Sequence, residues 1–356
     1  MSESSDMPNA YFPDEIIREI LSRLPVKSLL QFRSVSKHWK SLISDTHFIQ
    51  SHYKIVETLS THHRILAPVY PLLSLNYNAS PDNISSSIKL DCPFLMPRPF
   101  IKFLGSCNGL VCLIDGTKDI IIYNPSTRRY FKPFQSPQCF FHISYASNQT
   151  EFVYGFGCGL NPFDIRVVIF PRFARDSELV KFKVYDFIDS VGTFLNGSLH
   201  WLARHSNTDN GSRVVASFDV SKEAFRDISL PTQKADRPYF SVGNIKGCLS
   251  AHRDGLYHTN VEVWLMREYG VVDSWSMFIK IPTDMGGSEI SYMRPLCCVN
   301  DDEILIEIEL QQYAVYNGKT KTFRLLRSVW NLGPVGDSAV YVESLLSPEV
   351  VSCVSY

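Results

Sequence analysis

The sequence lacks an excess of charge of either sign and has no long apolar run. Its 35 lysine and arginine residues face 36 aspartate and glutamate residues, which leaves a net charge of −1 at pH 7. Nucleic acids and anionic membranes attract proteins with a basic excess, so we expect neither as a partner. Runs such as Ile120-Ile121-Ile122-Tyr123 are far shorter than the roughly 20 residues that span a bilayer. Because no signal-peptide pattern precedes Phe12, we expect the protein in the cytoplasm, the nucleus or both.

The sequence is also poor in the motifs of cofactor and metal chemistry. Its nine cysteines are scattered and odd in number, which favours neither a disulfide framework nor a zinc ribbon. The glycines of residues 155–159 resemble the start of a dinucleotide loop, but Leu160 stands in the place of the third glycine and Pro162 follows where a helix should begin. No P-loop or Gly-x-Ser-x-Gly elbow is present. We therefore expect no cofactor and no catalytic residue.

Isolated histidines and acidic residues are better explained by packing and solvation than by metal binding. His200 and His205 lack the helical spacing of a zinc protease, and His200 stands beside Trp201 in an expected strand, so we interpret it as a packed core residue. The group Asp301-Asp302-Glu303 has neither the spacing nor the central glycine of a calcium loop. We interpret it as a solvated turn before a strand and expect no metal site.

Residues 12–43 have the pattern of a compact helical unit. Pro13 suits the first turn of a helix, and Asp14 and Glu15 place negative charge at its positive end. Pro25 should end this helix. Between these points, apolar residues recur at steps that lay them along one helical face: Ile16, Ile17, Ile20, Leu21 and Leu24.

Two further helices are expected before residue 44. The second begins at Val26 and carries Leu29, and the third begins near Ser36, which suits an N-cap, and carries Trp39. Chains shorter than about 40 residues rarely fold alone without a metal, a disulfide or a partner. Part of the apolar surface of this unit should therefore face another protein.

These helices resemble the F-box of plant F-box proteins. The resemblance rests on Phe12-Pro13-Asp14-Glu15-Ile16-Ile17, Ile20-Leu21, Leu24-Pro25-Val26-Lys27-Ser28-Leu29 and Val35-Ser36-Lys37-His38-Trp39. Phe12 stands where the family usually has leucine, and Ser36 where animal members often have cysteine. The resemblance implies a three-helix domain that binds the Skp-family adaptor of an SCF ubiquitin ligase and, through it, cullin. The residues that it places in the adaptor interface are Phe12, Pro13, Glu15, Ile16, Ile20, Leu21, Leu24, Leu29, Val35 and Trp39.

Two other interpretations of this helical head remain open. The apolar stripe can be the core of the domain itself. Alternatively, a helix-turn-helix bound to DNA would use Arg33, Lys37, His38 and Lys40 for phosphate contacts. The balanced charge of the chain argues against the second alternative, because DNA-binding heads usually carry a basic excess over the whole domain.

From residue 63 onward the sequence has the pattern of many short strands. Apolar residues alternate or run in short bursts between clusters of glycine, proline, asparagine and aspartate. In residues 180–185 and 304–310 every second side chain is apolar, as in strands with one buried face. Asn124-Pro125 and Asn317-Gly318 each follow a strand that ends in an aromatic residue, and a turn is expected there.

These strands recur with a period typical of propeller blades. Gly109, Gly155, Gly197 and Gly247 are separated by 46, 42 and 50 residues, which is close to the period of kelch and WD repeats. Four-stranded sheets arranged radially suit strands this short and this numerous. We therefore predict a mainly β chain with a small N-terminal α domain and a β-propeller of six blades. Residues 339–342 should complete the sheet that begins near Ile65.

The β part resembles the F-box-associated, kelch-like domain of the same plant family. The motifs that carry this resemblance are Gly105-Ser106-Cys107-Asn108-Gly109-Leu110, Ile122-Tyr123-Asn124-Pro125-Ser126-Thr127, Tyr154-Gly155-Phe156-Gly157, Phe194-Leu195-Asn196-Gly197-Ser198-Leu199-His200-Trp201, Trp264-Leu265-Met266-Arg267-Glu268-Tyr269-Gly270 and Tyr341-Val342-Glu343-Ser344-Leu345. The family commonly has a longer strand pair at residues 185–191, which predicts one shortened blade. The expected divisions are a flexible tail (1–10), the F-box (11–50), a linker (51–62), the β domain (63–346) and a C-terminal tail (347–356).

The resemblance implies a substrate receptor, in which the adaptor holds the F-box and the β domain holds a target protein for ubiquitination and degradation. Two alternatives are a propeller hydrolase or oxidase with an unrelated helical head, and a scaffold that binds the adaptor but no ubiquitination target. Recognition is expected in the loops at 163–175, 204–213, 252–260 and 284–294, because loops usually carry binding residues. Arginine and tyrosine are enriched at interface hot spots. The candidate target-binding residues are therefore Arg172, Arg175, Arg253, Tyr257, Tyr292 and Arg294.

Overall fold

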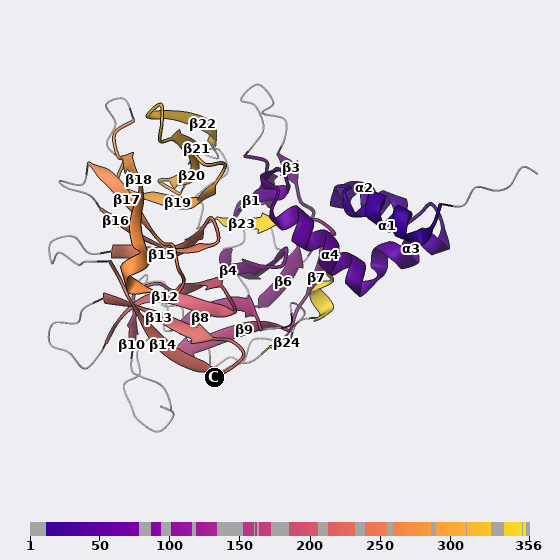
Figure 1. Cartoon of the computed structure of the whole chain (residues 1–356), viewed down its shortest axis with the longest axis horizontal. Helices are drawn as coiled ribbons and strands as arrows, with labels where there is room; N and C mark the ends of the chain where they lie inside the picture. The colour runs from indigo at the N-terminus through magenta and orange to yellow at the C-terminus, as the bar shows by residue number, and fades with distance from the viewer. Residues whose placement is uncertain are drawn as a thin grey trace, which may run out of the picture.

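The computed structural model describes a mainly β chain with helices at its N-terminal end (Figure 1). No helix among the residues that it describes is long and apolar enough to cross a membrane. The described residues are 12–77, 87–93, 101–115, 119–133, 152–159, 161, 164–171, 185–205, 213–231, 239–254, 259–285, 290–310, 312–328, 338–350 and 352–353.

The head contains four helices, and the prediction of three was wrong in number. Each predicted helix is present: α1 (Asp14–Ser22) follows Pro13, α2 (Val26–Phe32) follows Pro25, and α3 (Lys37–Ser44) follows Ser36. The Ser36 hydroxyl caps α3 by accepting a hydrogen bond from the Trp39 amide at 3.0 Å.

The fourth helix, α4 (Thr46–Glu57), extends from the predicted F-box into the predicted linker. The Asp45 carboxylate caps it by accepting from the Phe48 amide at 3.1 Å. Apolar residues recur along it at helical spacing, with Phe48 and Val56 buried. From the sequence this segment was compatible with either a helix or an irregular linker, because polar residues separate its apolar positions.

The strands form five sheets, and the first and last strands of the β domain share one of them. The strands are β1 (His63–Ala67), β2 (Leu73–Leu75), β3 (Ile88–Lys89), β4 (Lys102–Cys107), β5 (Leu110–Ile114), β6 (Ile120–Asn124), β7 (Arg129–Phe131), β8 (Phe152–Cys158), β9 (Ile165–Pro171), β10 (Tyr185–Phe187), β11 (Val191–Leu195), β12 (Ser198–His205), β13 (Arg213–Asp219), β14 (Ala224–Ser229), β15 (Tyr239–Ile245), β16 (Cys248–Asp254), β17 (Asn260–Met266), β18 (Trp275–Pro282), β19 (Met293–Cys298), β20 (Glu303–Ile308), β21 (Gln312–Asn317), β22 (Thr322–Ser328), β23 (Ala339–Val342) and β24 (Ser352–Cys353). As predicted, β23 pairs with β1, and Val340 lies opposite Ile65.

The prediction of six blades was wrong. Four sheets have four strands each, in the orders β23-β1-β2-β3, β4-β5-β6-β7, β15-β16-β17-β18 and β19-β20-β21-β22, and correspond to separate blades. The remaining sheet has eight strands, because β11 pairs in parallel with β8. The strand predicted at residues 180–185 lies outside the described residues except for Tyr185, where β10 begins.

Two glycines explain how β8 and β11 join. Gly155 and Gly192 lie opposite each other in the parallel pairing. A Cβ atom on Gly155 would stand 2.6 Å from a methyl carbon of Leu199, and one on Gly192 would stand 2.5 Å from the ring of Trp201. Only glycine leaves room there for these two buried side chains. The join begins at Val191, the end of the segment where a shortened blade was expected.

Tight turns recur at equivalent places in the sheets. Asn108-Gly109, Asn196-Gly197 and Lys246-Gly247 have positive φ at both residues, as two-residue type I′ hairpins require. A second kind of turn follows Asn124, Asp219 and Asn317. In each, the side-chain oxygen accepts from the two backbone amides at positions i+2 and i+3. The turns predicted at Asn124 and Asn317 are therefore confirmed, and the turn at Asp219 has the same hydrogen bonds.

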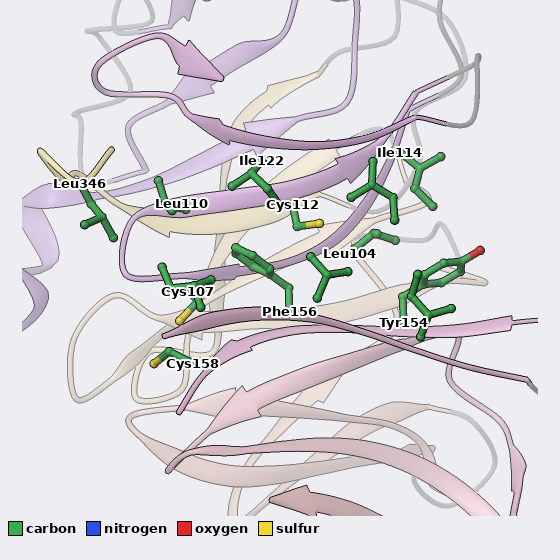
Figure 2. Close-up of a cluster of buried hydrophobic side chains, with 14 residues drawn as sticks. Leu104, Cys107, Leu110, Cys112, Ile114, Ile122, Tyr154, Phe156, Cys158 and Leu346 are labelled. Atoms are coloured by element: carbon green, nitrogen blue, oxygen red, sulfur yellow. The ribbon is translucent and has the colours of Figure 1, made fainter. Parts of the chain in front are cut away.

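Apolar clusters fill the spaces between neighbouring sheets. The cluster in Figure 2 joins β4–β6 to β8 and β9 and also receives one residue from the C-terminal segment. Its members are Leu104, Cys107, Leu110, Cys112, Ile114, Ile120, Ile122, Tyr154, Phe156, Cys158, Ile165, Val167, Ile169 and Leu346.

We expect Gly109→Ala to destabilise the protein much more than Gly197→Ala. Both glycines have positive φ, at +78° and +71°, so alanine is strained at each by about 1 kcal/mol. At Gly109 the new Cβ would also stand 2.1 Å from the Ser344 Cβ, whereas nothing lies within 4 Å at Gly197. Overpacking adds about 1–3 kcal/mol. Urea unfolding of both variants measures the difference, and equal losses would show that Gly109 does not contact the C-terminal segment.

Candidate protein-binding surface of the helical head

Helix α1 carries two apolar faces rather than one. Ile17 and Leu21, one turn apart, point inward, and Leu21 is buried in the core of the head. Ile16 and Ile20, also one turn apart, are exposed by 46% and 53%. The sequence analysis placed all of them on a single stripe, because a step of one residue turns the helix by only about 100°. The structure divides that wide stripe between the core and the surface.

The exposed residues belong to a larger group, which we call the apolar head surface and define as Phe12, Ile16, Ile20 and Val35. Phe12 is exposed by 68% and Val35 by 61%. A contact between the Asp14 carboxylate and the His38 imidazole at 2.9 Å ties the start of α1 to the start of α3. Four large apolar side chains left open to water on so small a unit indicate a protein-binding surface.

The other residues of the predicted adaptor interface lie around or beneath this surface. Pro13 and Glu15 are exposed at the start of α1. Trp39 is partly buried and packs edge-on against Phe32 at 5.4 Å between ring centroids. The buried core of the head consists of Leu21, Val26, Leu29, Ile43, Phe48 and Leu345, with Leu24 packed against it. Leu21, Leu24 and Leu29 therefore support the apolar head surface from inside.

The C-terminal segment of residues 343–346 joins the head to the β domain. Leu345 lies in the core of the head, and Leu346 lies in the cluster between β4–β6 and β8–β9. Asn124 donates from its side-chain amide to the carbonyls of Ser344 and Leu346, at 3.0 and 2.7 Å. Ile49 of α4 packs against both clusters. Sequence reasoning found these residues only as part of a family motif and missed their role.

Glu343 adds an ionic contact to this segment. Its carboxylate accepts from the Arg64 guanidinium at 3.1 Å and contacts the His62 ring at 3.3 Å. Burial acts to raise the pKa of Glu343, but the hydrogen bonds and positive charge of His62 and Arg64 leave it below the ordinary value. A carboxyl whose pKa is lowered by folding stabilises the protein above its unfolded pKa, and this contribution is lost as the pH falls through the folded pKa.

We expect Glu343→Gln to cost about 1–3 kcal/mol at pH 7, the range for a hydrogen bond to a charged group. The difference from the original protein should shrink as the pH falls below the ordinary glutamate pKa and should be lost below the lowered folded pKa, where the original carboxyl is neutral as well. Urea unfolding at pH 7 and at lower pH measures both values. Glu349→Gln, at an exposed glutamate close in sequence, is the matched control and should have no effect. A loss that does not change with pH would contradict an ionic role for Glu343.

The predicted target-binding residues are only partly described. Arg172, Arg175 and Tyr257 lie outside the described residues. Tyr292 is partly buried, and its backbone amide donates to the Glu309 carboxylate at 3.1 Å.

The two described arginines of this set are engaged within the β domain. Arg253 donates to the Glu262 carboxylate at 2.8 Å, and its guanidinium lies over the ring of Trp264. Arg294 donates twice to the Glu307 carboxylate, at 2.9 and 2.6 Å, and once to a backbone carbonyl. These pairs use side chains from neighbouring strands, a contact that a single-sequence argument does not reveal.

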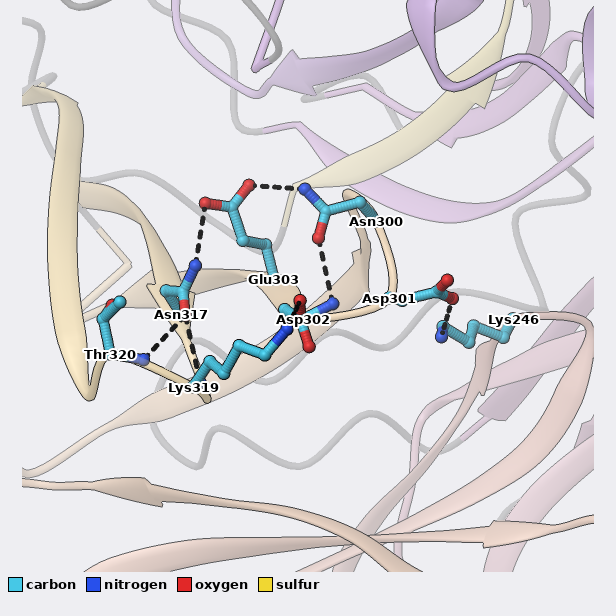
Figure 3. Close-up of polar contacts among 8 residues, drawn as sticks. All are labelled: Lys246, Asn300, Asp301, Asp302, Glu303, Asn317, Lys319 and Thr320. Carbon is cyan, nitrogen blue, oxygen red and sulfur yellow. Dashed lines mark hydrogen bonds and ion pairs between the residues drawn. The ribbon is translucent and has the colours of Figure 1, made fainter.

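The acidic group at residues 301–303 forms the solvated turn that the sequence analysis expected (Figure 3). Asp301 is 98% exposed, and Lys246 of a neighbouring sheet donates to it at 2.8 Å. The Asp302 carboxylate accepts a hydrogen bond from the Lys319 ammonium group at 3.1 Å. Glu303 accepts from the Asn300 amide at 2.8 Å. The group therefore links turns of the β15–β18 and β19–β22 sheets.

His200 is the packed core residue that was expected. It is fully buried, its Nδ1 bonds to the Thr193 carbonyl at 3.1 Å, and its Nε2 bonds to the Tyr269 hydroxyl at 2.7 Å. Burial lowers the pKa of His200 to about 4, so the ring is neutral near pH 7. Among the described residues, no three His, Cys, Asp or Glu side chains are grouped so that they could hold a metal ion.

The fold and the site together define a β-propeller protein with a helical head that exposes apolar side chains. Two family models match the chain: the F-box domain over residues 11–51 and the F-box associated beta propeller domain over residues 64–345. The chain therefore belongs to the plant family of F-box proteins that carry an F-box associated beta propeller domain.

Curated relatives cover almost the same length. The F-box/kelch-repeat protein At3g23880 of Arabidopsis thaliana is 28% identical over 369 residues, which is 94% of this chain and 95% of the relative. The F-box protein CPR1 of the same plant is 28% identical over 359 residues, covering 89% of this chain and 84% of the relative. The Arabidopsis F-box protein At5g49610 is 28% identical and covers 90% of this chain and 92% of the relative.

Proposed function

We propose that this protein is the substrate-recognition subunit of an SCF-type ubiquitin ligase. The head binds a Skp-family adaptor and, through it, cullin, and the β domain binds a target protein for ubiquitination and degradation. The observation that carries the proposal is the apolar head surface, which remains exposed although the head has a complete buried core. A head that only covered the β domain would have no reason to expose these side chains.

The proposed mechanism is proximity. A receptor that holds its target beside the transfer enzyme raises the effective concentration of the target lysines and needs no catalytic group of its own. The contacts of residues 343–346 with both domains suit this role, because a fixed head presents the target at a fixed position. In this proposal the protein works in the cytoplasm, the nucleus or both, where ubiquitin ligases act.

The target-binding surface is proposed on the side of the β domain away from the head. Strands β16 and β17, which flank one of the predicted recognition loops, lie far from the helices (Figure 1). Loops on a rigid scaffold commonly carry recognition. A target held there does not compete with the adaptor for the same surface.

Reconstitution tests the proposed function. The intact chain is purified with and without the adaptor and cullin, and proteins captured from cells with an inhibited proteasome are identified by mass spectrometry. We expect co-elution with both ligase subunits and capture of a protein that becomes ubiquitinated in the reconstituted mixture. Adaptor binding with capture of partners that are never modified would support the scaffold alternative instead. Failure to bind the adaptor would overturn the proposal.

A further inference from the structure

Two buried cysteines of different sheets meet under α4. Cys107 ends β4 and Cys158 ends β8, and these strands belong to two separate sheets. Both side chains lie at the same end of the cluster in Figure 2, close enough for each thiol to shift the pKa of the other. Other described cysteines, such as Cys92 and Cys297, neighbour tyrosines instead.

The surroundings of the pair distinguish its two sulfur atoms. The side-chain amide of Asn108, the residue that follows Cys107, donates to the Cys158 sulfur at 3.7 Å. The Asn108 bond favours the thiolate of Cys158, and the pKa of Cys158 is lowered, first by the neighbouring Cys107 thiol and then by Asn108, although burial acts to raise it. The pKa of Cys107 is raised by the neighbouring Cys158 thiol and by burial. The Cys158 sulfur is therefore suited to attack an oxidant, and the Cys107 thiol is suited to react afterwards with the oxidised Cys158 sulfur.

Helix α4 lies against this pair. Its residue Ile49 packs against the cluster that contains both cysteines. Cys158 keeps 8% of its surface exposed and Cys107 keeps 5%. A peroxide molecule is little larger than water, so it needs only a small opening. The pair thus lies where two sheets and the helix that links them to the F-box come together.

We propose that Cys107 and Cys158 form a reversible disulfide when the protein is exposed to a peroxide, and that this bond staples the β4–β7 sheet to the eight-stranded sheet beneath α4. This modification site is independent of the proposed ligase function. In reducing compartments such disulfides are transient and serve as redox sensors.

The chemistry balances with hydrogen peroxide as the oxidant. The Cys158 thiolate attacks one peroxide oxygen, so that an S–O bond forms, the O–O bond breaks, and hydroxide leaves and takes up a proton as water. The Cys107 thiol then loses its proton and attacks the sulfenic sulfur, forming the S–S bond while the second hydroxide leaves as water. Two thiols and one peroxide give one disulfide and two waters, and the two electrons pass from sulfur to oxygen.

The test uses the folded, full-length protein treated with hydrogen peroxide at neutral pH. Free thiols are then alkylated, and the digested protein is analysed by mass spectrometry. We expect a linked peptide pair that contains Cys107 and Cys158 and that dithiothreitol separates. Cys248→Ser, at a more exposed cysteine outside the pair, is the matched control and should keep the link. In Cys107→Ser, Cys158 should stop at a sulfenic acid that dimedone traps.

A second measurement tests whether the disulfide stabilises the folded protein. The disulfide closes a long loop, so the oxidised protein should melt several degrees above the reduced protein, and Cys107→Ser should show no such rise. Two results would overturn the proposal: both cysteines remaining free to alkylate while other cysteines oxidise, or Cys158 pairing with another cysteine. A link that leaves the melting temperature unchanged would contradict the staple. The search for a linked Cys107–Cys158 peptide pair in the protein of unmodified sequence tests the proposal even if a serine variant does not fold.

Discussion

Replacing Ile20 with aspartate is expected to abolish binding of the Skp-family adaptor without unfolding the protein. Ile20 is 53% exposed on α1, so the folded chain can hold a charged side chain there in water. In a complex the same carboxylate would be buried against apolar atoms without a partner, which costs about 2 kcal/mol or more. Since about 1.4 kcal/mol is a factor of ten, affinity should fall at least about 30-fold.

A pull-down or titration calorimetry with purified adaptor measures this loss. Ile55→Asp is the matched control, because Ile55 is also an exposed isoleucine of the head, at 38%, but lies on α4 outside the apolar head surface. It should bind the adaptor normally. Trp39→Ala should also weaken binding, with some loss of stability, because Trp39 packs on Phe32. Undiminished binding by folded Ile20→Asp would refute the assignment of the adaptor interface to the apolar head surface.

Removing residues 336–356 is expected to unfold the β domain. The deletion takes away β23, which pairs with β1 along four residues, and the bond between the hydroxyls of Tyr341 and Ser74 at 2.8 Å. It also removes buried Leu345 and Leu346. Loss of one buried leucine side chain lowers the free energy of unfolding by about 2–5 kcal/mol. The free energy of unfolding of a whole domain is only about 5–15 kcal/mol. The native cooperative transition should therefore disappear.

Thermal unfolding followed by circular dichroism checks this expectation. A shorter deletion, of residues 347–356, is the control, because it keeps β23 and residues 343–346 and removes only the last turn and β24. It should retain a cooperative transition. If the longer deletion keeps its transition within a few degrees of the intact protein, the sheet formed by the two ends of the domain is not needed for the fold, and an open arrangement of sheets is preferable.

Local chemistry in the sequence predicted the local structure well. Ser36 marks the start of α3 because its hydroxyl caps the backbone amide of Trp39, and Pro13 and Pro25 mark the starts of α1 and α2 because proline fixes its own φ and lacks an N–H. Asn108-Gly109 gives its hairpin because both residues adopt positive φ. The pairing of β23 with β1 was predicted because a propeller must join its last blade to its first.

Features that depend on contacts between distant residues were not predictable from one sequence. The joining of β8 to β11 requires Trp201 to fill the space that Gly155 and Gly192 leave, and no local pattern reports this contact. The ion pairs of Arg253 and Arg294 are equally non-local. These arginines have the residue type of a hot spot, but residue type alone does not separate a surface anchor from a contact between strands.

The position of Leu345 has a consequence for the order of events during synthesis. The head contributes residues 21–48 to its own core, but Leu345 completes that core from the far end of the chain. Protein domains usually fold from the N-terminus as they leave the ribosome. Here the first domain to emerge must wait for almost the whole chain before its last core side chain arrives. A nascent chain that stops early therefore presents an unfinished head, and under the proposed function it could bind the adaptor only when translation is nearly complete.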